Sequence, residues 1–181
     1  MNIQIISKKV KDLSKKEIDF MNGVRLKIYG KGSSVDFKKE DKKGEFIFVK
    51  ENGKIMAFGM MKPVKVKLNG KDYTILGIGR GITIKQSKGW GKVLNAARIL
   101  ELKRTGKTGV AFTGKKNLEF FRKVGYQIGK DGIRKFAYKN PKTGKLEYDG
   151  DGDIVYYEGK DKFVTKLLNS KNKAITNTDF W

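Results

Sequence analysis

A glycine-rich segment in the middle of the chain has the composition of a phosphate-binding loop. The segment is Gln86-Ser87-Lys88-Gly89-Trp90-Gly91, and Lys92 follows it. Glycines allow successive backbone amides to point into one concavity, and the start of a following helix adds partial positive charge. These groups bind a pyrophosphate without a particular side chain, and the two lysines add charge. The segment predicts a site for a phosphorylated cofactor.

The chain contains no cysteine and no histidine. Their absence excludes disulfides, zinc sites built from these residues, Ser-His-Asp triads and cysteine nucleophiles. An acyl transfer here must therefore be direct, or use a serine, lysine or carboxylate nucleophile.

Two further segments resemble known ligand-binding motifs but lack required residues, and no metal site is expected. Residues 149–153 carry alternating aspartates, but Ile154 and Lys160 stand where a calcium loop needs glycine and glutamate. An acidic turn is the better interpretation. Residues 109–116 nearly match the phosphate loop of nucleoside triphosphatases, but Lys116 replaces the Ser or Thr that would hold magnesium.

The glycine-rich segment lies between a predicted strand over 73–85 and a predicted helix over 89–104. Three glycines of this strand share one parity: Gly77, Gly79 and Gly81. A strand face without side chains allows either a ligand or a helix to approach the backbone closely. The predicted helix has a buried stripe at Val93, Ala97 and Leu100.

Local signals predict the other elements. A strand over 2–7 precedes a helix that begins at a Ser14–Glu17 capping box and ends at Gly30. Asn-Gly turns at 52–53 and 69–70 connect strands over 46–50, 54–60 and 63–68. A strand over 108–113, a short helix over 117–124 and a strand from Tyr126 follow. Beyond these, strands over 134–140 and 153–159 are joined through a turn, a helix covers 162–168, and the last dozen residues are expected to be loose.

Residues 45–130 resemble the GCN5-related N-acetyltransferases (GNAT). Gln86, Gly89 and Gly91 match the family's cofactor signature between its fourth strand and the following helix. The fifth strand and the short helix of the family match residues 110–113 and 120–126. The resemblance implies an α/β fold with a mixed, twisted sheet of six or seven strands and helices on both faces. Residues 1–130 would form the acyltransferase core, and 131–181 would complete or extend the same domain.

The resemblance also implies a cosubstrate, acetyl-CoA, and a direct attack of an amine on its thioester. The fourth and fifth strands would separate, and backbone groups near Ile82 and Ile84 would pair with pantetheine. The amides of 86–91 would hold the pyrophosphate. Asn117 and Phe121, on the short helix, would also contact the cofactor.

The family's frequent general-acid tyrosine falls at Phe121, which has no proton to donate. Three other residues are candidates for a catalytic role. Arg80 either lowers the pKa of the acceptor amine through like charge or is a cation on the solvated face of the sheet. Tyr126 either donates a proton or packs at the start of a strand. Some related acyltransferases use the carboxylate at their chain end as the base, which implies Trp181.

Positive charge is concentrated in one part of the sequence. The chain has 41 basic and 19 acidic residues, and residues 61–130 hold 17 of the former and 3 of the latter. The positive electrostatic field of this segment therefore favours an acceptor amine carried on a nucleic acid or on an acidic macromolecule over a polycationic acceptor. The alternative is a catalytically degenerate module that binds nucleic acid or another polyanion. A third interpretation is a lysine-rich, solvated surface.

The sequence contains no apolar run of membrane-spanning length, and its first apolar residues are too few for a secretory signal. We therefore expect a cytoplasmic protein without a membrane partner.

The charge of residues 61–130 predicts salt-sensitive binding to RNA or DNA. The logarithm of affinity should fall with the logarithm of salt concentration by about one unit per phosphate neutralised, because bound counterions are released. Fluorescence anisotropy of a labelled oligonucleotide measures this slope. A flat plot, or no binding at low salt, would mean that the charged residues only form a solvated surface.

Overall fold

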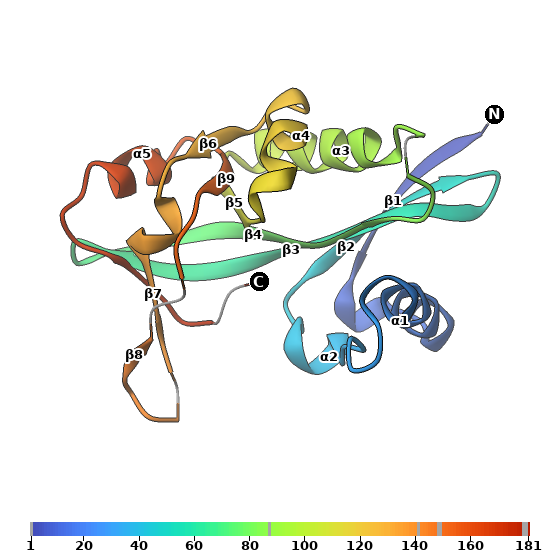
Figure 1. Ribbon diagram of the computed structural model, residues 1–181, viewed down its shortest axis with the longest axis horizontal. Coiled ribbons are helices and arrows are strands. Elements are labelled where there is room, and N and C mark those ends of the chain that lie inside the picture. Colours follow the sequence, from blue (N-terminus) through green and yellow to red (C-terminus); the bar gives the residue numbers. More distant parts are fainter. Residues whose placement is uncertain (1, 87, 141, 148–149, 179–180) are drawn as a thin grey trace. The chain divides into compact units, whose positions relative to one another are not determined.

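The computed structural model describes residues 2–86, 88–140, 142–147, 150–178 and 181. Figure 1 traces the course of the chain. The chain divides into two compact units, of which unit 1 holds Met1–Lys62 and Gly81–Leu94, and unit 2 holds Pro63–Arg80 and Asn95–Trp181. Three elements contribute residues to both units: β3 (Lys54–Leu68), β4 (Lys71–Thr83) and α3 (Trp90–Thr105). Within the described ranges, no helix has the length and apolarity of a membrane span.

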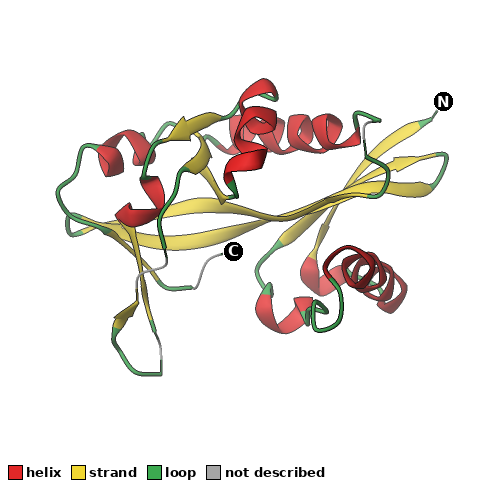
Figure 2. Cartoon of the chain, viewed as in Figure 1, coloured by secondary structure: helices red, strands yellow, loops and turns green. Residues whose placement is uncertain are grey.

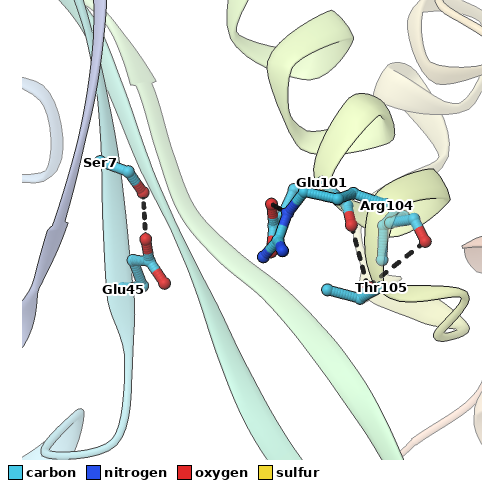
Figure 3. A network of polar contacts seen from close by, with 6 residues as sticks. Ser7, Glu45, Glu101, Arg104 and Thr105 are labelled. Carbon is cyan, nitrogen blue, oxygen red and sulfur yellow. Dashed lines mark hydrogen bonds and ion pairs between the residues drawn. The ribbon is translucent and has the colours of Figure 1, made fainter.

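The strands of unit 1 pair in antiparallel fashion. β1 (Ile3–Lys9) pairs with β2 (Glu45–Glu51), and β2 pairs with β3. Asn52 and Gly53 connect β2 to β3 with φ angles of 48° and 78°, as a type I′ hairpin requires. The Ser7 hydroxyl of β1 donates a hydrogen bond to the Glu45 carboxylate of β2 (Figure 3). The predicted strands over 54–60 and 63–68 are one continuous strand.

Helix α1 (Lys15–Tyr29) begins at the predicted capping box. The Glu17 amide donates to the Ser14 hydroxyl at 3.2 Å, and the Ser14 amide donates to the Glu17 carboxylate at 2.9 Å. The helix ends at Gly30, which has a φ of 83°. Both ends of the helix therefore follow from local sequence.

The core of unit 1 is largely aromatic. Phe37 of α2 (Phe37–Glu40) meets Phe46 of β2 edge to face, with ring centroids 5.2 Å apart. Phe48 and Phe58 extend this cluster across β2 and β3. The rings are completely buried, so they anchor the hairpin against α2.

Unit 2 contains a mixed sheet in which the strands follow the order β6, β9, β5, β4, β3, β10, β7, β8. Its short strands are β5 (Gly109–Phe112), β6 (Gln127–Gly129), β7 (Phe136–Lys139), β8 (Leu146–Glu147), β9 (Ile154–Tyr157) and β10 (Ala174–Thr176). The β4–β5 and β7–β10 pairs are parallel, whereas β5–β9, β6–β9, β7–β8 and β3–β10 are antiparallel. The predicted α/β class with a mixed sheet is confirmed. The described chain has ten strands rather than six or seven, because several are too short to give a pattern in the sequence.

The helices of unit 2 are the later part of α3, α4 (Leu118–Lys123) and α5 (Phe163–Leu168), which appear red in Figure 2. Single turns of 3-10 helix cover Val10–Asp12 in unit 1, and Lys115–Asn117 and Gly132–Lys135 in unit 2. α5 packs into a core shared with β3, β4 and β5. At the end of α3, Arg104 is bonded to the Glu101 carboxylate and the Thr105 hydroxyl donates to the Glu101 carbonyl (Figure 3).

Two expectations for the C-terminal third are wrong. Residues 174–176 are not loose but form β10, which pairs with β3 on one side and β7 on the other. The strands near 134–140 and 153–159 are not hairpin partners, since β7 pairs with β8 and β9 lies between β5 and β6. Short apolar strands indicate burial, but they do not specify which strand lies beside them.

Ser14→Ala should lower the free energy of unfolding by about 1 kcal/mol, because the Glu17 amide loses its acceptor at the start of α1. Urea denaturation followed by circular dichroism measures the change. Ser34→Ala, at an exposed loop position, is the matched control and should leave stability unchanged. Equal losses in the two variants would contradict a stabilising cap.

Candidate functional site

The glycine-rich segment lies in unit 1, between the end of β4 and the start of α3. Gly89 has a φ of 80°, in the left-handed region that favours glycine. Its carbonyl accepts hydrogen bonds from the amides of Lys92 and Val93 at 2.9 and 3.2 Å, so α3 begins here. No described atom lies within 4 Å of the place a Cβ would take on Gly89. A side chain at this position would therefore have open space.

The side chains around this helix start differ in their exposure. Gln86, Lys88 and Lys92 are exposed, whereas Trp90 is buried and contributes to packing. Gly91 lies in the first turn of α3, and Ser87 lies outside the described residues. Two ammonium groups and a helix N-terminus within one short segment form a site suited to a phosphate or pyrophosphate.

The backbone of Ile82 and Ile84 is directed differently from the sequence-based expectation. Ile82 is buried in the aromatic core of unit 1, and Ile84 packs against that core. The Ile84 amide donates to the Met56 carbonyl of β3 at 2.9 Å, so it is engaged within the sheet rather than directed toward a ligand. Alternate residues of a strand direct their amides to opposite edges. The amides of Gly81 and Thr83 are therefore directed toward the opposite edge of the strand.

In unit 2, the parallel ladder between β4 and β5 is very short. The Leu76 amide donates to the Thr108 carbonyl at 2.8 Å. Only the pairs Leu76–Gly109 and Gly77–Val110 follow among the described residues, although both strands continue. The two strands therefore separate, as the family resemblance implied, and leave backbone hydrogen-bonding edges without a strand partner.

Two arginines lie at this part of β4. Arg80 is half-buried and has a φ of 53°, which is uncommon for a residue with a side chain and marks an irregularity in the strand. Arg98 of α3 is buried and donates from Nη2 to the Gly79 carbonyl at 2.8 Å. Its Nη1 donates to the Asn95 side chain at 3.3 Å. A carbonyl of β4 is thus bonded to a helix side chain.

Tyr126 lies beside Arg98 in the interior of unit 2. Burial raises the pKa of the Tyr126 hydroxyl to about 12, against the opposing effect of the Arg98 charge. Burial lowers the pKa of Arg98. The Tyr126 hydroxyl has no hydrogen-bond partner in the part of the chain that the structure describes. Its ring packs edge to face on Phe121, with centroids 5.5 Å apart. These contacts support the packing interpretation of Tyr126, whose hydroxyl stays protonated at neutral pH.

The Trp181 side chain lies where β4 and β5 separate. Its Nε1 donates to the Val110 carbonyl at 2.7 Å, and a Cβ added to Gly77 would lie 2.6 Å from the indole ring. On the opposite face of the ladder, a Cβ added to Gly109 would lie 2.7 Å from the Leu102 side chain of α3. Helix and indole therefore cover the two faces of the ladder at the same level.

The remaining candidates and carboxylates lie on other surfaces of unit 2. Asn117, before α4, is exposed and its side-chain amide donates to the Thr113 hydroxyl at 3.0 Å. The three carboxylates between 61 and 130 form ion pairs with basic neighbours: Asp72 with Lys67, Glu101 with Arg104, and Glu119 with Arg122 and Lys123. Each is therefore placed for surface pairing rather than as a buried general base.

Sequence reasoning missed Arg98 and Asn95. The predicted stripe of α3 is partly wrong, because Leu100 is 64% exposed while Leu94, Arg98 and Leu102 are buried. These three residues follow one another at intervals of four, which is the helical signal that was available. This spacing was not recognised as a buried stripe because Arg98 is charged, and a charged residue is normally assigned to the solvated face.

No protein-family model and no curated protein matches the sequence. Among solved structures, the chain is similar to the GNAT family N-acetyltransferase YhbS of Escherichia coli in complex with CoA, with a TM-score of 0.60 and 13% identity over 96% of this chain and 88% of that one. The chain is also similar to Escherichia coli ElaA, with a TM-score of 0.58 and 14% identity over 87% of this chain and 100% of that one. For a GNAT family acetyltransferase from Elizabethkingia anophelis with acetyl-CoA bound, the TM-score is 0.52 and the identity is 18%, over 87% of this chain and 98% of that one. At such identities the likeness is one of fold.

Tyr126→Phe should leave the free energy of unfolding unchanged within about 1 kcal/mol, because the hydroxyl that it removes is buried without a hydrogen-bond partner among the described residues. Thr108→Val is the contrasting variant. The buried Thr108 hydroxyl is bonded to the Asp161 carboxylate at 2.5 Å and to the Gly159 amide at 2.9 Å, so its loss should cost about 1–3 kcal/mol. Chemical denaturation measures both. A large loss in Tyr126→Phe would mean that its hydroxyl has a structural role.

Proposed function

We propose that this chain, whose fold is that of the GCN5-related N-acetyltransferases, transfers an acetyl group from acetyl-CoA directly to an amine. The observation that carries the proposal is the β4–β5 ladder, which stops after two residue pairs while both strands continue. A sheet interrupted in this way has backbone donors and acceptors for an extended ligand that contains amides. The chain order supports the same ligand, because β4 leads directly into a segment suited to a pyrophosphate.

The backbone of β4 and the start of α3 would hold the cosubstrate. Gly81 and Thr83 would pair with pantetheine amides, because they alternate with Ile84, whose amide is bonded to β3. The 86–91 segment would bind the pyrophosphate, with charge added by Lys88 and Lys92. The solved structures of YhbS with CoA and of the Elizabethkingia protein with acetyl-CoA support this choice of cosubstrate.

The transfer itself needs a neutral amine. Its nitrogen forms a bond to the thioester carbonyl carbon and releases a proton, the carbon–sulfur bond breaks, and the sulfur leaves as a thiolate that takes up a proton. A lysine-like amine with a pKa of about 10.4 is neutral in about one molecule in two thousand at pH 7. The carboxylates of 61–130 are engaged in ion pairs. We therefore assign Arg80 and the surrounding lysines to lowering the pKa of the acceptor amine through like charge.

The acceptor is, in this proposal, an amine on an acidic or nucleic-acid-associated molecule. The support is electrostatic: 17 basic and 3 acidic residues between 61 and 130 attract polyanions and repel free polyamines. The field would raise the local concentration of such acceptors.

A second candidate function is a binding module on the same fold without catalysis. Phe121 favours it, because this residue stands at the family's tyrosine position and packs against Phe120 and Tyr126. Binding of acetyl-CoA together with slow acetyl transfer would favour the enzyme, whereas polyanion binding without acetyl-CoA binding would favour the module.

Acetyl-CoA should raise the melting temperature of the protein. At a hundredfold excess over its dissociation constant the ligand adds about 2.7 kcal/mol to stability. Gly91→Glu should abolish the shift, because it places a carboxylate in the first turn of α3 where the pyrophosphate would bind. Thermal shift assays with and without ligand measure the effect.

Gly23→Glu is the matched control, because it makes the same charge change in another helix of unit 1 where a side chain has open space. This variant should keep the full ligand-induced shift. No shift in the wild type at millimolar acetyl-CoA would contradict the proposed function.

A further inference from the structure

The Trp181 indole is hydrogen-bonded to the last strand pair of the β4–β5 ladder. The Leu76 amide donates to the Thr108 carbonyl, and in a parallel ladder the next bond of this series runs from Ile78 to Val110. The Val110 carbonyl also accepts from Trp181 Nε1 at 2.7 Å. The indole therefore stands at the last strand pair, Gly77–Val110.

The surroundings hold the indole in this position. Gly77 leaves the space that the ring fills, since a Cβ there would lie 2.6 Å from Cγ and Cδ1 of Trp181. The ring packs on Phe112 with centroids 4.8 Å apart and meets Phe136 edge to face at 6.4 Å. One polar bond and two aromatic contacts thus fix the indole against the core of unit 2. It is part of the packed structure rather than a loosely attached group.

We propose that the Trp181 indole closes the inner end of the β4–β5 opening and limits the size of the acyl group that the protein accepts. The inference rests on the proposed function. In the proposed function, pantetheine pairs along β4 and runs toward the N-terminal part of that strand. Within unit 2 its acyl end would therefore meet the residues around Gly77 and Val110, where the indole leaves little room.

The test compares binding of CoA, acetyl-CoA, butyryl-CoA and hexanoyl-CoA to the wild type and to Trp181→Ala by isothermal titration calorimetry. This measurement needs no acceptor. The wild type should bind acetyl-CoA more tightly than butyryl-CoA or hexanoyl-CoA. Trp181→Ala should shift the butyryl-to-acetyl affinity ratio by about tenfold toward butyryl-CoA, because the vacated space encloses two further methylene groups.

Two further variants keep the test decisive. Trp181→Phe retains most of the ring and loses the donor, so its selectivity should stay within about threefold of the wild type by the same volume argument. Trp181→Leu keeps apolar packing and should shift the ratio in the same direction as alanine, and it decides the matter if Trp181→Ala does not fold.

The outcomes separate this inference from the proposed function. If neither CoA nor any acyl-CoA binds to the wild type, the proposed function fails. If all four ligands bind but their order is the same in every variant, the indole does not limit the acyl group and the inference is overturned. Equal tightening of all four ligands in Trp181→Ala would also overturn it, because the indole would then block the opening as a whole.

Discussion

The early end of the β4–β5 hydrogen-bond ladder is the constraint around which unit 2 is organised. A buried backbone group without a partner costs about 1–3 kcal/mol, so strands that separate inside a sheet need substitute partners. Two side chains add donors at this part of the sheet. Trp181 donates to the Val110 carbonyl of β5, and Arg98 donates to the Gly79 carbonyl of β4. Side chains therefore bond to the strand carbonyls beside the opening.

Helix α3 accounts for the burial of an arginine. Arg98 lies between Leu94 and Leu102 on the buried stripe, so its guanidinium reaches the sheet where an apolar residue would offer no donor. Burial disfavours the charge and lowers the pKa of the group. The fixed fork of donors on guanidinium explains why arginine suits the position, since Gly79 and Asn95 are bonded at the same time. The same helix begins, in unit 1, at Gly89, whose carbonyl accepts from the amides of Lys92 and Val93.

Local signals in the sequence were sufficient for much of the fold. The Ser14–Glu17 capping box, the Asn52-Gly53 hairpin and the start of α3 at Gly89 each depend on neighbours within a few residues. The features that escaped prediction depend on distant residues. β10 is a strand only because β3 and β7 lie beside it, and nothing near Trp181 in the sequence indicates Gly77 or Val110. The separation of β4 from β5 was anticipated through the family resemblance, not through residue patterns.

The close approach of Trp181 to Gly77 makes the two positions share one volume. A larger residue at 77 and a tryptophan at 181 are sterically incompatible, although each alone suits its local backbone. Sequence change at this point of the sheet must therefore be concerted. Chains of this lineage should show covariation between the two positions. They should carry either residues of intermediate size at both positions, or glycine at 77 together with tryptophan at 181.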